Sequence, residues 1–378
     1  MRLIDRYILR QFLGTFFFVV LILVSVITVI DLTEKTEKYV KNNVSAMQIL
    51  GYYLDFVPWV AGLITPITVF IATVYVTSRM AGRTEIVAIL SSGVSFKRLM
   101  LPYFLGAFVI ASLSFWLNGW IIPNSNKTRL AFEVEYLKGK YYFDQRNIHI
   151  QVEPGVFLYM QSYNNTTDVG YRFTMERFEG NRLIEKLSAN SIVWDANKEK
   201  WILKNWLHRK VDPIFVLASL TRDSIPQDSI FYERPRDVIT RGDSKDTTLV
   251  IHPKEFESDY RKFDGMTLND LDEYIETLRA RGSAGVLPYE VEKHTRYAAP
   301  FSIFILAFMG VIVSARKSRG GTGFQIALGF LLSFIFILFF MMFRSFAEAG
   351  SLPAGISVWI PNIIFALIAA LMYKYVPR

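Results

Sequence analysis

The stretch FLGTFFFVVLILVSVITVI, residues Phe12 to Ile30, decides the fold class of this chain. It runs for 19 residues without a charged side chain, and an α-helix needs roughly 20 residues to cross about 30 Å of hydrocarbon. Arginines precede it, but it is longer than the apolar core of a signal peptide, and no small-residue cleavage site follows it. We therefore interpret it as a membrane-spanning helix.

Five further apolar runs have a similar length, and hydrophobic residues make up 52% of the chain. They lie at 56–76, 101–122, 298–315, 324–343 and 356–375. The polar segment between the third and fourth runs, 123–297, contains no run of that length. The sequence therefore predicts a membrane α-helical fold with six transmembrane helices. Three lie in 1–122 and three in 298–378, with a separate domain inserted between them.

The inserted segment is predicted to be mostly β. Short alternating or β-branched and aromatic runs are separated by Asn, Asp, Gly and Pro turn residues. They lie at 148–163, 171–180, 191–211 and 214–225. The sequence WDANKEKW, from Trp194 to Trp201, is typical of a hairpin with a longer turn. Repeated short antiparallel strands predict an all-β, jelly-roll-like domain.

The end of the inserted domain has a different pattern. In MTLNDLDEYIETLRARG, residues 266–282, the apolar residues recur at helical spacing. Thr267 can cap a helix at its start, and Gly282 can stop it. We predict an amphipathic helix at 267–281, between the sheet and the membrane.

Positive charges predict the orientation. With the N-terminus in the cytoplasm, the cytoplasmic loops and tails hold twelve Lys and Arg, and the opposite short loops hold Lys35, Lys38, Lys41 and Arg344. Because Lys and Arg are enriched in cytoplasmic loops, we predict cytoplasmic N- and C-termini and an external inserted domain. The chain has no cysteine, so no disulfide supports that domain.

The net charge of +8 does not favour nucleic acid as a partner. The polar segment 123–297 carries 26 Lys and Arg against 27 Asp and Glu, so the excess belongs to the membrane part. A basic face on the large soluble domain, which nucleic-acid binding requires, is therefore not expected.

Signatures of chemistry are missing from the sequence. It has no phosphate-binding loop of the G-x-x-x-x-G-K-[ST] type, no H-E-x-x-H and no G-x-S-x-G. The four histidines, at 149, 208, 252 and 294, are not spaced for a metal. Acids are nearly missing from the six apolar runs, which argues against a proton relay. We predict no enzyme activity and no catalytic, metal or cofactor site in this chain.

The loop SRMAGRTEIVAILSSGVSFKRL, residues 78–99, joins the second and third runs on the predicted cytoplasmic side. Residues 79–91 form a short helix candidate, with Gly93 as a stop and Ser95 as the cap of the next helix. Such a helix could receive force from a soluble partner. Its basic residues could equally do no more than anchor the loop at the membrane surface.

The part RTEIVAILSSGVSFKRL resembles the cytoplasmic loop of the lipopolysaccharide-export permeases, the LptF/LptG family. In that family, a Glu, a hydrophobic run and a small-residue turn form the coupling helix that docks on a partner ATPase. Other stretches resemble the family in the same order: IDRYILRQF, then MTLNDLDEYIETLRARG with YEVEKHTRYAAPFSI, then RGGTGFQIALGF and EAGSLPAGISVWIPN. The resemblance covers essentially the whole chain, and the last two stretches are closer to LptG.

The resemblance implies a transmembrane permease subunit of an ABC-type lipopolysaccharide exporter in the bacterial inner membrane. Its implied partners are a second permease of the family, a cytoplasmic ABC ATPase dimer, a periplasmic bridge of jelly-roll domains, membrane lipids and lipopolysaccharide. Glu85 would be the coupling acid, with Arg83 and Gly93 beside it. An acid on a helix surface can pair with a basic groove of a partner and fix the docking register.

For the substrate, the family uses basic residues near the outer end of the first helix to meet lipid phosphates. This chain has Lys35, Lys38 and Lys41 there, and Arg296 and Arg344 near the outer ends of the fourth and fifth spans. Each lysine also follows an acid by four residues, the spacing of ordinary helix-stabilising pairs. The two arginines could instead be anchors that reach the membrane surface.

Other classes of protein stay open. A membrane-anchored sensor would need a cytoplasmic output domain, whereas the cytoplasmic parts here are short loops and tails. A mechanically coupled permease for another lipid or for lipoproteins commonly has four spans, with its domain after the first. The division into three and three spans argues against that class.

Overall fold

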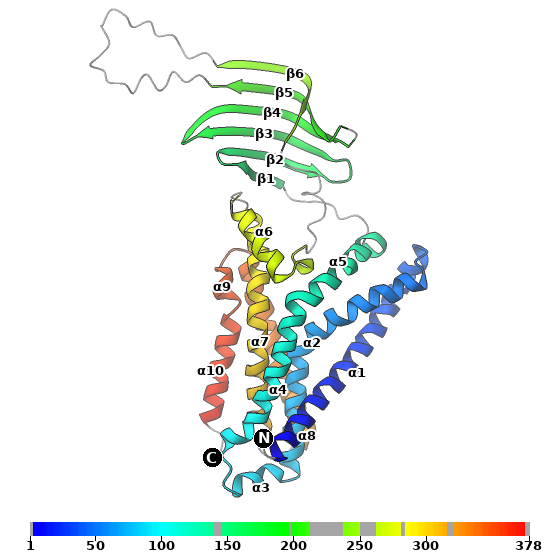
Figure 1. Cartoon of the computed structure of the whole chain (residues 1–378), viewed down its shortest axis with the longest axis vertical. Helices are drawn as coiled ribbons and strands as arrows, with labels where there is room; N and C mark the ends of the chain where they lie inside the picture. Colours follow the sequence, from blue (N-terminus) through cyan, green and yellow to red (C-terminus); the bar gives the residue numbers. More distant parts are fainter. Residues whose placement is uncertain are drawn as a thin grey trace, which may run out of the picture. The chain divides into compact units, whose positions relative to one another are not determined.

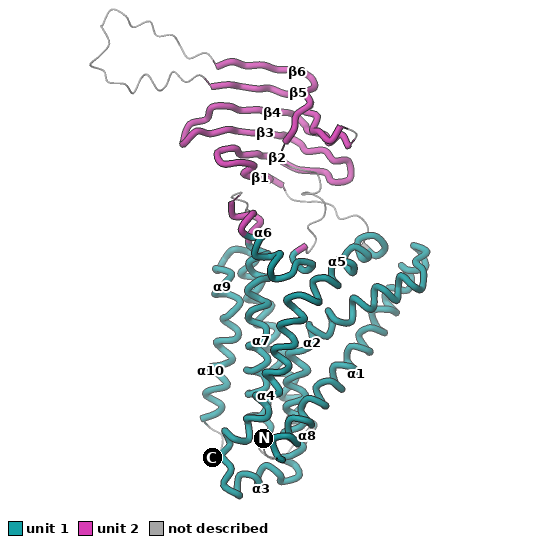
Figure 2. Tube along the Cα trace, viewed as in Figure 1, with its two compact units in different colours: residues 1–139, 263–275, 287–378 teal, residues 140–262, 276–286 magenta. Residues whose placement is uncertain are grey.

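The computed structural model describes residues 3–138, 146–196, 198–211, 237–249, 262–280, 284–315 and 321–374. They belong to two compact units (Figure 2): 1–139, 263–275 and 287–378 form the first, and 140–262 and 276–286 form the second. The first unit is helical and the second contains the sheet. The strand predicted at 214–225 lies outside the described residues.

Six helical rods are long and apolar enough to cross a membrane, which confirms the predicted fold class. The first two are α1 (Leu3–Lys41) and α2 (Ala46–Gly82), and the third is built from α4 (Phe96–Trp116), η1 (Leu117–Ile121), α5 (Ile122–Phe132) and η2 (Glu133–Lys138). The last three are α7 (Leu287–Ser314), α8 (Gly321–Glu348) and the pair α9 (Ala354–Ser357) with α10 (Ile360–Lys374). Shorter elements are α3 (Glu85–Ser91), η5 (Lys262–Gly265), α6 (Leu268–Ala280) and η6 (Ala284–Val286).

Several rods extend beyond the apolar runs that predict them. The third continues to Lys138 instead of ending near 122, and the fourth begins at Leu287 instead of 298. Pro123 cannot donate a backbone hydrogen bond, and the π-helical turn η1 lies directly before it. The polar ends remain helical because ion pairs and hydrogen bonds satisfy their side chains. The acids Glu133 and Glu292 therefore belong to the helical rods.

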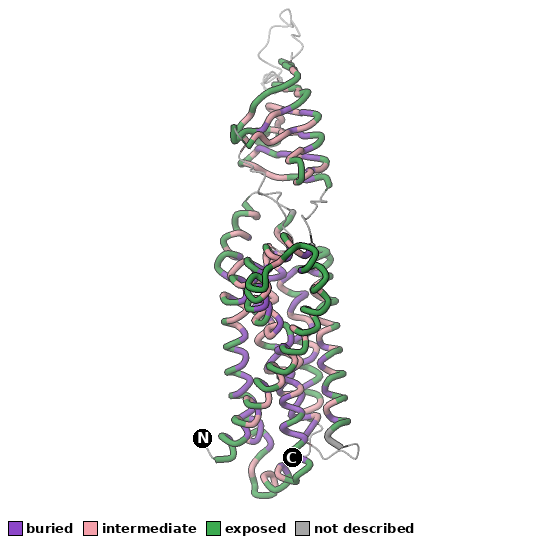
Figure 3. Tube along the Cα trace, turned by 90° about the vertical axis from the view of Figure 1, so that its right-hand side faces the viewer, coloured by how far each residue is buried: buried purple, intermediate pink, exposed green. Residues whose placement is uncertain are grey.

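The helix α2 packs against α1, α5, α7 and α8 (Figure 1). Small residues allow the close contacts: a methyl group at Gly310 of α7 would lie 3.0 Å from Thr73, and one at Gly329 of α8 would lie 2.7 Å from the Phe70 ring. Such close packing of small residues is the usual way in which membrane helices associate. The second, third and fourth spans are the most buried, whereas α1 and α8 are the least buried; Figure 3 colours the residues by burial.

The second unit contains an open antiparallel sheet of six strands in the order of the chain. The strands are β1 (Arg146–Glu153), β2 (Val156–Asn164), β3 (Val169–Glu179), β4 (Arg182–Asp195), β5 (Lys200–Lys210) and β6 (Val238–Thr247). Every described strand pairs with its neighbour in sequence, which leaves β1 and β6 at the two edges of the sheet. The prediction of an inserted all-β domain is thus confirmed.

Turn residues and alternating side chains position these strands. Trp194 pairs directly with Trp201, the two ends of the predicted hairpin. Gly155 has φ +78°, and a Cβ there would lie 2.6 Å from the Phe178 carbonyl oxygen, so this turn requires glycine. In β2, Leu158, Met160 and Tyr163 are buried and join a hydrophobic core with residues of the other strands.

Candidate functional site

The loop between the second and third spans contains a shorter helix than the predicted 79–91. The helix α2 continues to Gly82, Thr84 adopts a left-handed conformation with φ +61°, and α3 covers only Glu85–Ser91. A left-handed residue cannot continue an α-helix, so Thr84 separates the two helices. Residues 79–82 therefore belong to the membrane rod.

Apolar side chains of α3 pack against the bundle: Ile86 is buried in its core, and Ile89 and Leu90 are partly buried against the same core. Ile86 is 2% exposed and joins the same hydrophobic core as Met80 and Phe96. Val87, the next residue, is 63% exposed. The side chain of Glu85 is 30% exposed and lies 3.8 Å from the Arg83 guanidinium. An acid and an apolar residue are therefore accessible on a helix that the bundle holds in place.

The end of α3 has the turn chemistry that the sequence predicts. Gly93 has φ +84°, and its amide donates to the carbonyl oxygen of Leu90. Ser95 caps α4 by accepting from the backbone amide of Arg98. Because both ends of this turn are fixed, α3 and α4 are tightly connected.

At the opposite end of the bundle, Lys35 is closely paired. Its ammonium group lies 2.7 Å from Asp31 and donates to the Tyr52 hydroxyl at 2.7 Å. Tyr53 donates a hydrogen bond to the same Asp31 carboxylate. In this conformation the charge of Lys35 is thus neutralised within the chain.

Lys38 and Lys41 are more accessible. Lys38 is exposed and donates to the carbonyl oxygen of Leu137 at 3.2 Å. Lys41 is exposed, and no ion pair connects it to an acid among the described residues. Of the three acid–lysine pairs that the spacing predicts, only Asp31 with Lys35 forms an ion pair within 4.0 Å in the described part of the chain.

A buried arginine, which the sequence interpretation did not single out, lies near Lys35. Arg129 is 3% exposed, contacts Glu133 at 2.5 Å and lies 4.3 Å from the centre of the Trp59 ring. Tyr52 donates to the same Glu133 carboxylate at 3.3 Å. The spacing of Arg129 and Glu133 is four residues, which could have revealed the pair had the third span been predicted to continue that far.

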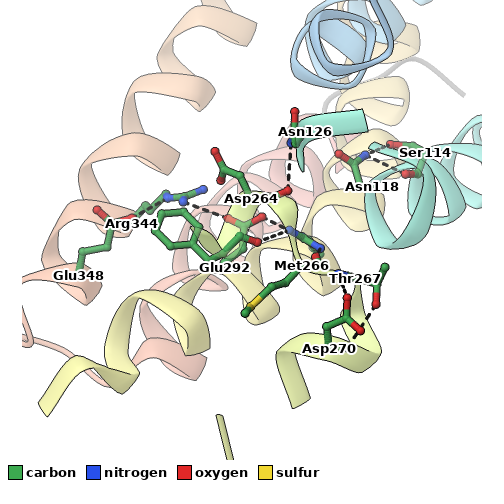
Figure 4. A network of polar contacts seen from close by, with 12 residues as sticks. Ser114, Asn118, Asn126, Asp264, Met266, Thr267, Asp270, Glu292, Arg344 and Glu348 are labelled. Carbon is green, nitrogen blue, oxygen red and sulfur yellow. Dashed lines mark hydrogen bonds and ion pairs between the residues drawn. The ribbon is translucent and has the colours of Figure 1, made fainter. Parts of the chain in front are cut away.

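Arg296 and Arg344 meet at a shared acid (Figure 4). Arg296 donates to Glu292 at 2.8 Å within α7, and Arg344 of α8 donates to the other oxygen of Glu292 at 3.0 Å. Arg344 also donates to Glu348 at 2.8 Å. A charged network therefore connects two membrane helices through one carboxylate.

The same network holds the segment that precedes α6. Arg296 donates to the backbone carbonyl oxygens of Met266 and Phe263, at 2.5 and 2.9 Å. Asn126 of α5 donates to the carbonyl oxygen of Asp264 at 3.0 Å. The polar contacts of Arg296 are thus all within the protein, and its side chain is only 5% exposed. The side chain of Arg344 is 26% exposed.

The described residues therefore divide into two separate regions of interest. Glu85, Arg83 and Gly93 lie around α3, and the basic residues lie toward the other end of the bundle (Figure 1). Arg296 and Arg344 are brought together, whereas Lys35, Lys38 and Lys41 follow α1. Sequence interpretation missed Glu292 because the fourth span was predicted to begin after it.

The helices and the inserted sheet define a multi-pass membrane protein with a β domain between two sets of three spans. The family described as "Lipopolysaccharide export system permease LptF/LptG" matches residues 6–375. The chain belongs to this family of inner-membrane permeases, which are not enzymes themselves.

The chain is also similar to a curated relative from Haemophilus influenzae (strain ATCC 51907 / DSM 11121 / KW20 / Rd), the lipopolysaccharide export system permease protein LptG. The two are 19% identical over 365 residues, which cover 96% of this chain and 95% of the relative. The similarity therefore includes both sets of spans and the inserted domain.

Proposed function

We propose that this chain is the transmembrane permease subunit of an ABC-type lipopolysaccharide exporter. It would extract lipopolysaccharide from the inner membrane together with a second permease of its family. A separate cytoplasmic ATPase dimer would supply the energy. Both termini would be cytoplasmic and the sheet domain periplasmic, as the distribution of Lys and Arg predicts.

The observation that carries the proposal is the arrangement of α3. Ile86 fixes this helix to the hydrophobic core, while Glu85 and Val87 stay accessible. A partner with a basic, partly apolar groove could hold these residues, since charge complementarity fixes register and partner choice. Movement of the partner would then be transmitted through Ile86 to the spans.

Contact with the lipid phosphates is assigned first to Lys38 and Lys41, because both side chains are exposed and neither forms an ion pair among the described residues. Lys35, Arg296 and Arg344 would have to exchange carboxylate partners to take part. Oppositely charged partners of this kind can be exchanged when a phosphate offers equally strong, charge-assisted hydrogen bonds.

Transfer to the periplasmic bridge would use an edge of the sheet. The strands β1 and β6 each have one side without a strand partner among the described strands, and most residues of β6 are exposed. Unpaired edge strands can bind another β-strand by main-chain hydrogen bonds. A jelly-roll domain of a bridge protein fits that surface.

The test is a co-purification of the tagged chain in mild detergent, assayed for the ATPase subunit and for lipopolysaccharide. We expect the Glu85→Lys variant to co-purify with at least tenfold less ATPase than the wild-type chain and with the same amount of lipopolysaccharide. The double variant Lys38→Glu/Lys41→Glu is expected to lose lipopolysaccharide and to retain the ATPase, so each charge reversal controls for the other.

Glu37→Lys, an exposed acid on α1 far from α3 in sequence, is the further matched control and should retain the ATPase. Normal ATPase binding by Glu85→Lys would contradict the coupling role. Retention of lipopolysaccharide by the double lysine variant would contradict the assigned phosphate contacts.

A further inference from the structure

The first four turns of α1 line an open groove of about 620 Å³. The described residues that line it lie on one face of the helix and include Arg6, Tyr7, Arg10, Gln11, Gly14 and Thr15. This groove is on the N-terminal part of α1, whereas the basic residues discussed above follow its C-terminal part. It is therefore a separate site.

The groove carries two positive charges that no acid among the described residues neutralises. Arg6 and Arg10 are four residues apart, both are exposed, and neither forms an ion pair in the described ranges of the chain. The neighbouring acid, Asp5, is 5% exposed and contacts Arg98 of α4 at 2.6 Å. The acid next to the groove is thus directed into the bundle, and the groove keeps a local excess of positive charge.

The polarity of this face changes along α1. Gly14 has open space where a side chain would stand, because among the described residues no side chain and no other helix lies within 4 Å of that position. Beyond it, Phe17, Phe18 and Leu21 are 49%, 64% and 66% exposed. The surface therefore passes from two guanidinium groups, through an open gap, to a wide apolar stripe.

We propose that this groove binds an anionic glycerophospholipid of the membrane leaflet at the N-terminal end of α1. Arg6 and Arg10 would hold the phosphate by charge-assisted hydrogen bonds, and Tyr7 and Gln11 would meet the headgroup hydroxyls. The acyl chains would run over Gly14 and the apolar stripe. The assignment to the cytoplasmic leaflet rests on the orientation in the proposed function.

Charge complementarity selects this ligand. Basic clusters at the cytoplasmic ends of membrane helices attract anionic headgroups. The general enrichment of Lys and Arg in cytoplasmic loops depends only on how many charges a loop carries, not on where they lie. It does not require that two arginines share a face with a gap and an apolar stripe.

The experiment is native mass spectrometry of the purified chain, released from detergent after titration with phosphatidylglycerol or with phosphatidylcholine. The wild-type chain is expected to retain at least fivefold more phosphatidylglycerol than phosphatidylcholine. Arg6→Gln/Arg10→Gln should abolish this preference. The control Arg79→Gln/Lys97→Gln removes the same charge from exposed positions outside the groove and should keep the preference.

A second variant, Gly14→Leu, fills the gap without changing any charge and should also reduce retention of phosphatidylglycerol. Thermal unfolding of each variant shows whether it is folded. Unchanged preference in the folded arginine variant, or an equal loss in the control, would overturn the proposal. The arginine variant could instead lose a co-purified protein while its lipid retention stays unchanged. That result would overturn the lipid proposal and indicate that the groove binds a helix of a partner protein.

The ATPase is measured in the same samples, so the two proposals can fail separately. Loss of the lipid preference with the ATPase retained supports the groove as an independent site. A wild-type chain that never retains an ATPase would contradict the export function and leave the lipid result to be judged alone.

Discussion

Glu292 is a carboxylate inside a membrane helix, where a lone charge is costly. The structure provides two guanidinium groups for it, Arg296 on the same helix and Arg344 on α8. The Glu292 and Arg296 side chains are only 11% and 5% exposed, so solvent screens this pair little. The network around Glu292 positions neighbouring elements: it connects α7, α8 and the segment before α6 in one arrangement.

Glu292→Gln should destabilise the protein strongly. Removing one partner of a buried ion pair leaves uncompensated charge, which typically costs about 3–5 kcal/mol. We expect a loss of about 3 kcal/mol in the free energy of unfolding, measured by denaturant or thermal unfolding in detergent. The control is Glu348→Gln, because Glu348 also pairs with Arg344 but is 40% exposed.

The control Glu348→Gln should lower the free energy of unfolding by less than about 1 kcal/mol, because exposed ion pairs contribute little. If both variants lose equally little stability, Glu292 does not have the positioning role.

At the scale of single residues, the sequence could predict neighbours within one helix, as it did for Asp31 and Lys35. It could not predict that Lys38 would reach the carbonyl of Leu137, a contact made by tertiary packing over 99 positions.

The start of a helix can be predicted from local sequence where a capping residue marks it. Thr267 and Asp270 form reciprocal hydrogen bonds at 3.1 and 3.2 Å, and α6 begins directly after Thr267. The prediction of 79–91 as one helix differs from the structure because Thr84 takes a left-handed conformation that its residue type does not favour. Thr84 is the N-cap of α3, and Thr is a common residue at that position, but its residue type alone does not predict a left-handed conformation.

Acid should weaken the start of α6. The backbone amide of Thr267 donates to the Asp270 carboxylate and lowers the pKa of Asp270, with its hydroxyl and Lys127 acting in the same direction. A lowered pKa in the folded state means that the stabilisation is present above the ordinary pKa of about 4. It is then lost as the pH falls through the folded pKa.

We therefore expect Asp270→Asn to reduce protection of the first α6 amides by about 0.5–1 kcal/mol at pH 7. The wild-type chain should approach the variant as the pH falls below about 4. Hydrogen exchange measures both, with Glu276→Gln as a control on an exposed acid later in the same helix. A difference that persists unchanged at low pH would contradict the role of the charge.

At the scale of the whole molecule, apolar run length predicts the architecture because hydrocarbon thickness fixes how long a span must be. Six spans, their division into three and three, and the inserted β domain are confirmed on that basis. The ends of the spans were harder, since ion pairs such as Arg129 with Glu133 keep polar sequence helical. The shared acid of Arg296 and Arg344 could not be predicted, because it depends on how α7 and α8 pack.

The most direct measurement of the export function uses proteoliposomes that contain this chain, a second permease of its family and the ATPase. Lipopolysaccharide release to a soluble jelly-roll acceptor is followed with and without ATP. We predict release that depends on ATP hydrolysis and is lost in Glu85→Lys. ATP hydrolysis that leaves lipopolysaccharide in the vesicles while another lipid or a lipoprotein is released would contradict the assignment.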